Sequence, residues 1–210
     1  MIDRHFKPED RARIEAAVRA AEQRSRGEIV PVIVEKCDGY PEARFRGAFI
    51  TLAVATLAVL VTHVPVTLAE LALIQLGAAL IGGVVALWDP VERFLAGRAE
   101  RELAARDRAL RAFHEHALHR TRDGTGVLVF AALFEHQAVV IGDHGIDEKM
   151  GPEQWQRAVG ALVDGMRRKD PASGFCSAIE IIGGTLAQHF PRGPDDAGNE
   201  LDDALRSSKS

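Results

Sequence analysis

The side chains best suited to chemistry are carboxylates in loops that flank two predicted strands. Asp123 precedes a strand predicted for 125–134, and Asp143 and Asp147 follow a strand predicted for 137–141. In an antiparallel hairpin the start of the first strand and the end of the second share one edge, so the three carboxylates can converge there. Hard cations such as Ca²⁺ and Mg²⁺ prefer oxygen ligands. These residues are therefore a candidate cation site; the alternative is ordinary turn chemistry, for which Asp is well suited.

Three histidines lie close together in a predicted helix, but their spacing does not match that of a zinc helix. The HExxH pattern puts two histidines on nearly one helix face. Here His119 lies about 140° around the helix from His114. His116 and His119 are closer to one face, but two neutral imidazoles alone make a poor metal site. We therefore expect these histidines to form a solvated helix face.

The two cysteines show no pattern of a disulfide framework or a metal site. Cys37 and Cys176 are far apart in the sequence, and neither belongs to a CxxC pair. Cys176 lies near a predicted helix N-terminus, which can lower a thiol pKa, but no histidine is placed to activate it. We expect reduced thiols, with Cys176 packed as a small apolar residue.

The composition and the remaining motifs exclude several function classes. The chain has 26 Lys and Arg against 30 Asp and Glu, whereas nucleic-acid-binding proteins usually carry a clear basic surplus. We therefore expect no nucleic-acid partner. The sequence also contains no Walker A, GxGxxG or GxSxG pattern.

The segment Gly47–Trp88 determines how the rest of the chain is organised. It holds two apolar runs, and Glu70, near the start of the second run, is the one Lys, Arg, Asp or Glu residue in them. Each run is about 20 residues long, which as a helix spans roughly the 30 Å of a bilayer's hydrocarbon core. Pro65 lies between the runs, where a helix can end. We predict a transmembrane helical hairpin; the alternative is a pair of buried helices in a soluble bundle.

The flanking charges predict the orientation of this hairpin. Arg44 and Arg46 precede it, Arg93 and Arg98 follow it, and the connection between the two runs has no Lys or Arg. The positive-inside rule then places both termini and the globular part in the cytoplasm. The charged N-terminus lacks the apolar region of a signal peptide, so we expect the first membrane helix to act as the insertion signal.

Small residues in the second apolar run predict close helix contacts. Gly77, Gly82 and Gly83 form a small-residue surface, and the deeper Gln75 can hydrogen-bond another helix. We expect the hairpin helices to pack together or to self-associate, which would give a homo-oligomer. Glu70 is close enough to the start of its run to reach the membrane interface.

The rest of the chain predicts an α/β fold. A strand, a helical crossover and a second strand imply a parallel pair, and the following strand is antiparallel to the second. The expected result is a small mixed β-sheet with helices on both faces, into which the hairpin is inserted. Pro31 lies in the first strand and predicts an edge position or a bulge. The predicted elements are a helix over 8–26, a strand over 28–35, a helix over 91–120, strands over 125–134 and 137–141, a helix from 152 and a last helix through 175–190.

Three regions follow from this pattern. Residues 1–46 and 89–190 are predicted to form one discontinuous cytoplasmic domain, and residues 47–88 the transmembrane hairpin. Residues 191–210 are rich in Pro, Gly, Asp and Ser and poor in apolar residues, so we expect a disordered tail.

Two segments of this sequence resemble the TPM domain family, including its bacterial membrane-associated members. SRGEIVPVIVE is similar to the first strand of that family, and DGTGVLVFAALFEHQAVVIGDHGID is similar to its hairpin. The resemblance implies a TPM-like α/β domain at the bacterial inner membrane that helps to maintain membrane protein complexes. It also implies acid phosphatase-like activity and divalent-cation binding, as attributed to some members. This chain departs from the family pattern because the apolar hairpin is inserted in the first crossover.

The expected function is that of a membrane-anchored interaction, assembly or maintenance factor. Its expected partners are the lipid bilayer, membrane proteins and a second copy of the chain. The alternative is a metal-dependent, phosphatase-like hydrolase that uses the acidic loop residues with Ca²⁺ or Mg²⁺. That enzymatic alternative depends on the family resemblance alone.

Overall fold

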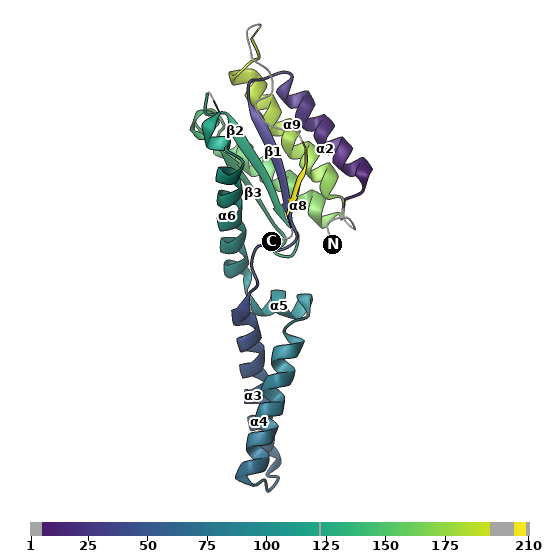
Figure 1. The fold of residues 1–210 in the computed structure, drawn as a ribbon, viewed down its shortest axis with the longest axis vertical. Coiled ribbons are helices and arrows are strands. Elements are labelled where there is room, and N and C mark those ends of the chain that lie inside the picture. Colours follow the sequence, from purple (N-terminus) through teal and green to yellow (C-terminus); the bar gives the residue numbers. More distant parts are fainter. Residues whose placement is uncertain (1–5, 122, 194–203, 209–210) are drawn as a thin grey trace. The chain divides into compact units, whose positions relative to one another are not determined.

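The computed structural model describes residues 6–121, 123–193 and 204–208. It divides into two compact units (Figure 1). We call Met1–Cys37 together with Glu102–Ser210 the globular unit, and Asp38–Arg101 the hairpin unit. The hairpin unit is longer than the predicted insert 47–88, because it includes the residues on both sides of the two apolar runs.

The globular unit contains a four-stranded mixed sheet in the order β3-β2-β1-β4. β1 (Glu28–Val34) and β2 (Gly126–Ala132) are parallel, with Glu28 opposite Gly126 and Val34 opposite Ala132. β3 (Gln137–Gly142) is antiparallel to β2. The predicted small mixed sheet is therefore confirmed, and its three predicted strands have the expected directions.

The fourth strand corrects the prediction of a disordered tail. β4 (Arg206–Ser208) pairs in parallel with Val32–Val34 of β1. Leu205, immediately before β4, is 6 % exposed and belongs to the core, so one apolar residue anchors this polar segment. The expectation of disorder is wrong for Arg206–Ser208. Residues 194–203 and 209–210 of the predicted tail lie outside the described residues.

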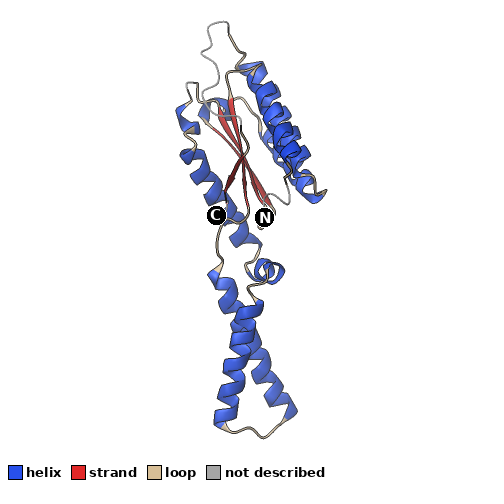
Figure 2. Ribbon diagram, turned by 45° about the vertical axis from the view of Figure 1, so that its right-hand side comes forward, coloured by secondary structure: helices blue, strands red, loops and turns tan. Residues whose placement is uncertain are grey.

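Helices cover both faces of the sheet, as the sequence predicted (Figures 1 and 2). α2 (Pro8–Glu22), α8 (Pro152–Arg167) and α9 (Pro171–His189) pack on one face, and α6 (Arg98–Glu115) packs on the other. All residues of β1 and β2 are buried, because successive side chains alternate between two apolar layers. One layer contains Ile29, Ile33, Val127, Val129 and Ala131, and the other Val30, Val32, Val34, Leu128, Phe130 and Ala132.

Pro31 lies where its missing N–H is tolerated. It is opposite Val129 of β2, and within the described part of the chain β4 pairs only with the three residues that follow it. β1 lies between β2 and β4, so the predicted edge strand is wrong for β1 as a whole and holds only locally at Pro31, which no β4 residue pairs with. β1 runs from Glu28 to Val34 without a break, so the predicted alternative of a bulge is wrong.

The long helix predicted for 91–120 is wrong, because the chain breaks twice. α5 (Asp89–Leu95) ends before Gly97, which has a φ of 69°. α6 then ends at Glu115, Ala117 adopts a φ of 56°, and a 3₁₀ turn, η1 (Leu118–Arg120), follows. Gly97 supplies a left-handed backbone without steric cost, which ends the first helix.

The hairpin unit consists of α3 (Pro41–Thr62), α4 (Leu68–Val85) and α5. α3 has Pro41 in its first turn, where the absent N–H costs no hydrogen bond. α4 begins with a capping box, in which Thr67 Oγ1 accepts from the Glu70 N–H and Glu70 accepts from the Thr67 N–H at 2.8 Å. Glu70 therefore fixes the start of α4.

The two long helices pack closely at Gly47 and Gly82. A Cβ added to Gly47 would lie 2.7 Å from the carbonyl oxygen of Gly82, so neither position has room for a side chain. Thr51 Oγ1 donates to the carbonyl oxygen of Ala78 at 2.6 Å, and Gln75 Nε2 donates to Thr56 Oγ1 at 3.3 Å. These contacts satisfy polar side chains between the helices.

Candidate functional site

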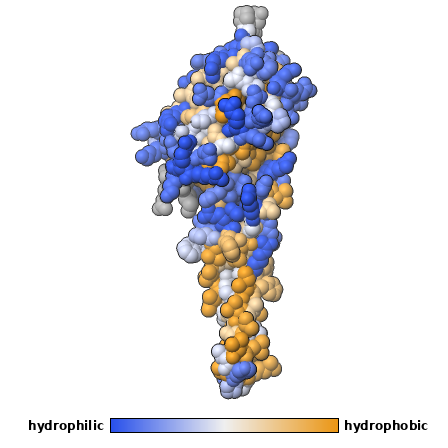
Figure 3. Space-filling view, turned by 180° about the vertical axis from the view of Figure 1, so that it is seen from behind, coloured by the Kyte–Doolittle hydropathy of each residue, from blue (hydrophilic) through white to orange (hydrophobic). Residues whose placement is uncertain are grey.

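The most distinctive surface of the chain is the apolar exterior of α3 and α4. Both helices are long and apolar enough to cross a membrane, and only 6 % of each apolar window is buried. Figure 3 shows apolar side chains gathered over this part of the chain on the face in view. A helix pair in a soluble core would be mostly buried, so this exposure argues against the predicted alternative. The largest exposed fractions belong to Phe45, Phe49, Val61, Leu68 and Leu73, at 67 %, 69 %, 68 %, 84 % and 68 %.

The three predicted packing glycines lie in two different environments. A Cβ at Gly82 would meet the backbone of Gly47 and the hydroxyl of Thr51. A Cβ at Gly77 or Gly83 would have no atom within 4 Å. Gly82 therefore serves contact within the hairpin, together with Gly47, which sequence reasoning missed. Self-association through Gly77 and Gly83 stays a prediction.

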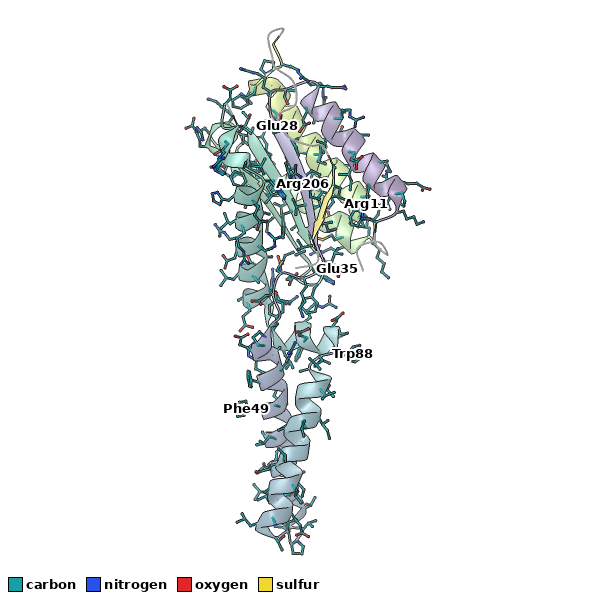
Figure 4. All side chains as sticks on the ribbon, in the orientation of Figure 1. Arg11, Glu28, Glu35, Phe49, Trp88 and Arg206 are labelled. Carbon is teal, nitrogen blue, oxygen red and sulfur yellow. The ribbon has the colours of Figure 1, made fainter. Side chains whose placement is uncertain are left out.

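Aromatic and cationic residues border the apolar surface in the hairpin unit. Trp88 is 67 % exposed and Phe94 is 83 % exposed. Figure 4 shows that Phe49 points away from α3 and that Trp88, in the turn between α4 and α5, also points outward. Arg46 donates to the Leu95 carbonyl oxygen at 2.6 Å and forms a bidentate ion pair with Glu100. Trp and Arg at the end of an apolar helix pair are typical of a membrane–water interface.

The globular unit has a separate feature, a groove of about 500 Å³ along strand β3. Every residue of β3 contributes to its floor. Among the described strands, β3 pairs only with β2, so it is the outer strand on this side of the sheet. The walls come from helices on both faces of the sheet: Glu102, Arg106 and Leu110 of α6, Asp147 of α7 (His144–Asp147), and Trp155 and Val159 of α8.

The groove is mainly apolar at its floor and carries charges on its walls. Trp155 packs over Gly142, where an added Cβ would lie 2.6 Å from the indole ring, so a larger residue would displace the ring. The indole N–H of Trp155 is buried and has no hydrogen-bond partner among the described residues. An outer strand also presents backbone N–H and C=O groups to its open side. This combination suits an extended peptide better than a small polar substrate.

The three predicted cation ligands have other contacts in the structure. Asp123 pairs with Arg26, with 3.0 Å between oxygen and nitrogen. Asp143 caps α7 by accepting from the His144 N–H at 2.8 Å, and Asp147 lines the groove. Across the described ranges, no group of three or more His, Cys, Asp or Glu side chains is arranged to hold a metal ion. Turn chemistry and ion pairing therefore account for Asp123 and Asp143.

A buried carboxylate that sequence reasoning missed joins two loops of the globular unit. Glu135 is 0 % exposed and accepts from the Cys37 N–H at 2.8 Å. Burial raises the pKa of the Cys37 thiol well above its usual range, and the nearby Glu135 carboxylate raises it further. Both effects disfavour the thiolate form of Cys37, which is the nucleophilic form of a cysteine. Burial also raises the pKa of Cys176, in agreement with its predicted packing role.

The histidines are not all on a solvated face. His114 and His119 are exposed, with their ring centroids 5.0 Å apart. His116 is half-buried, and its Nδ1 lies 2.7 Å from Nη1 of Arg206. The prediction is therefore wrong for His116, because β4, which contacts it, was not expected.

Comparison with known proteins gives one informative similarity. No family model and no curated protein matches this chain. Among solved structures, the chain is similar to the BA42 protein from the psychrophilic bacterium Bizionia argentinensis, determined by NMR. The TM-score is 0.60 at 20 % sequence identity, over 97 % of this chain and 95 % of BA42. This similarity concerns the fold, and the resemblance to the TPM family stays an expectation.

Proposed function

We propose that this chain is a membrane-anchored, TPM-like binding protein that assists or assembles membrane proteins. The hairpin α3–α4 would cross the bacterial inner membrane twice and hold the globular unit at its cytoplasmic side. One observation carries the anchoring proposal: both helices are long and apolar, and only 6 % of each apolar window is buried. At 1.5 Å per residue the charge-free part of α3, residues 47–62, is roughly 24 Å long and α4 is roughly 27 Å long, which is close to the thickness of the hydrocarbon core.

The polar groups of the hairpin support a lipid environment. Unpaired polar groups are costly in hydrocarbon, so they must find partners within the protein. Thr51, Thr56 and Gln75 all hydrogen-bond inside the hairpin, and Glu70 caps the start of α4. The outward surface is left to aliphatic and aromatic side chains, for which lipid tails are a better solvent than water.

The cationic borders support a cytoplasmic globular unit. Arg44 and Arg46 lie in the first turns of α3, and Arg93 and Arg98 follow α4. The connection between α3 and α4 carries no Lys or Arg. By the positive-inside rule this connection would face the periplasm.

A labelling experiment on the intact chain tests the anchor and its orientation. Val64 lies in the connection and is 54 % exposed, whereas Glu153 is an exposed residue of α8. Val64→Cys in intact cells should react with a membrane-impermeant maleimide, and Glu153→Cys should react only after the cells are broken. The protein should also stay in the membrane during a carbonate wash. Release by carbonate, or labelling of Glu153→Cys in intact cells, would refute the proposal.

The groove along β3 is the proposed binding face. Addition of an extended segment to an outer strand uses backbone hydrogen bonds for affinity and side-chain pockets for specificity. The groove follows the whole of β3, and Leu110, Trp155 and Val159 offer apolar walls for alternate side chains. We therefore expect an extended segment of a membrane protein as the partner.

Site-specific crosslinking tests this binding face. A photo-crosslinker at Val159, in the groove, should capture membrane proteins in cells. The matched control is the same group at Ala16, an exposed residue of α2. Equal capture from both positions would remove the support for the groove.

A further inference from the structure

The outer edge of β1 is covered by a short piece of the chain's own C-terminal region. β4 contributes three residues, which pair in parallel with Val32–Val34. The side chains of two consecutive residues, Leu205 and Arg206, hold β4 in place from opposite faces of the sheet. Leu205 is buried in the layer that contains α2 and α9, and Arg206 reaches His116 at the end of α6.

The contact between Arg206 and His116 requires a particular protonation state. Nη1 of Arg206 lies 2.7 Å from Nδ1 of His116. A guanidinium group has only N–H donors, so Nδ1 must be the acceptor and the imidazole must be neutral. Protonation would turn Nδ1 into a second donor and place two cations against each other.

We propose that β4 is a detachable strand, and that protonation of His116 releases it from the edge of β1. At neutral pH the neutral imidazole accepts from Arg206 and Leu205 occupies its place in the core. In acid the contact becomes repulsive, and β4 and Leu205 leave together because they are adjacent in the chain. Release would expose the backbone edge of Val32–Val34, so acid would open a second strand-binding edge on the sheet.

The charges around His116 determine the direction of the pH effect. Burial lowers its pKa, and Arg206 of β4 lowers it further; on α6, Glu115 raises it and Arg108 lowers it. The docked state therefore binds fewer protons than the released state, so docking is favoured as pH rises. The contribution of His116 to docking is fully present above the ordinary histidine pKa of 6.5 and is lost as pH falls below it, toward the lowered pKa of the docked state.

The test follows the methyl groups of Leu205 by NMR, in the full chain held in detergent micelles, between pH 8 and pH 5. Their chemical shifts should change from buried to random-coil values, with a midpoint below 6.5. The methyl groups of Ile182, a 0 % exposed core residue of α9, should keep their shifts throughout. The ring of His116 should titrate over the same range.

Matched variants identify the group responsible. His116→Gln keeps an acceptor oxygen that does not titrate, so Leu205 should stay docked down to pH 5. His119→Gln changes an exposed neighbour and should keep the transition. Arg206→Met removes the opposing cation and should shrink the pH effect. The proposal is overturned if wild-type Leu205 keeps one environment at every pH, if His116→Gln shows the same transition, or if Ile182 changes together with Leu205.

Discussion

Helices α4 and α9 are both apolar and both contain a Gly-Gly pair, but they bury their surfaces differently. In α9, Gly183 packs against Ala21 of α2, and Gly184 has open space around it. In α4, Gly82 packs against Gly47 of α3, and Gly83 has open space around it. The local arrangement is the same: one glycine permits a close helix contact and the other does not.

The difference lies in what surrounds each helix. α9 has ten buried residues, because it lies on the sheet and between neighbouring helices, whereas Gly82 is the only buried residue of α4. A Gly-Gly pair and an apolar composition therefore do not distinguish a soluble core helix from a membrane helix. The presence of a sheet and helices to cover the remaining surface makes that distinction.

The largest expected effect is in the core around α9. Phe175 is 0 % exposed, and its ring meets that of Phe6 edge-on, with centroids 6.3 Å apart. Phe175→Ala should lower the free energy of unfolding of the globular unit by about 3–5 kcal/mol, because it leaves a cavity. Chemical denaturation of the full chain in detergent, followed by tryptophan fluorescence, measures this. The matched change Phe49→Ala, on the exposed surface of α3, should leave that free energy unchanged.

The second prediction concerns a charged side chain placed on the exposed apolar surface of α3. Leu57 is 61 % exposed near the middle of the first apolar run. Leu57→Arg should disfavour membrane insertion by about 3–4 kcal/mol, because a charge must enter hydrocarbon and the favourable contribution of leucine is lost. The carbonate-resistant fraction should fall, whereas Leu57→Ala should keep it near the wild-type value. An unchanged fraction for Leu57→Arg would mean that this surface does not face lipid.

The Gly-Gly pairs provide the sharpest comparison. Gly183→Ala should destabilise the globular unit by about 1–3 kcal/mol through overpacking against Ala21. Gly184→Ala should be neutral or stabilising by up to about 1 kcal/mol, because alanine is the better helix former and has room.

The corresponding substitutions in α4 should differ in the same way, with the larger effect at the glycine that contacts another helix. Gly82→Ala should weaken the contact with α3, and Gly83→Ala should not. Crosslinking between cysteines placed on α3 and α4 reports that contact in the membrane. Equal effects at both positions would show that the helices pack differently in lipid.

The smallest effect is expected at the predicted cation ligands. Asp143→Ala removes the cap of α7 and should cost about 1 kcal/mol of stability. Calorimetric titration with millimolar calcium or magnesium decides whether this residue also binds a cation. A binding signal that Asp143→Ala abolishes would restore the predicted site and, with chelator-sensitive phosphate release, the phosphatase-like alternative.

Local sequence patterns were enough to predict three of the four strands of the sheet and the apolar hairpin. β1 and β2 are continuous apolar runs, and such runs form strands buried on both faces. The two charge-free runs became the two long apolar helices with a turn at the expected place. The prediction of one helix over 91–120 is wrong because the helical spacing of apolar residues continues past Gly97. The backbone at Gly97 adopts a left-handed conformation that ends the helix, and the spacing does not show this.

The features that sequence reasoning missed all depend on contacts between distant residues. Glu135 reaches Cys37, and Arg206 reaches His116, across separations that no short pattern encodes. The groove likewise requires β3 to be the outer strand, with walls supplied by α6 and α8. The loops that carry Asp123 and Asp143 do meet as predicted, since the Ile146 N–H donates to the Gly124 carbonyl oxygen at 3.2 Å, but the pairing of Asp123 with Arg26 of another segment was not predicted.

The amino-acid sequence alone determined which segments avoid water, because hydrophobicity and charge belong to each residue wherever it lies. It thereby specified the three apolar strands β1, β2 and β3, most of the helices and the two helices that are apolar enough for a membrane. Only the tertiary structure decided which polar groups meet and which strand edge stays open. Those outcomes depend on how distant segments pack, and burial then changes the chemistry of individual groups such as the Cys37 thiol.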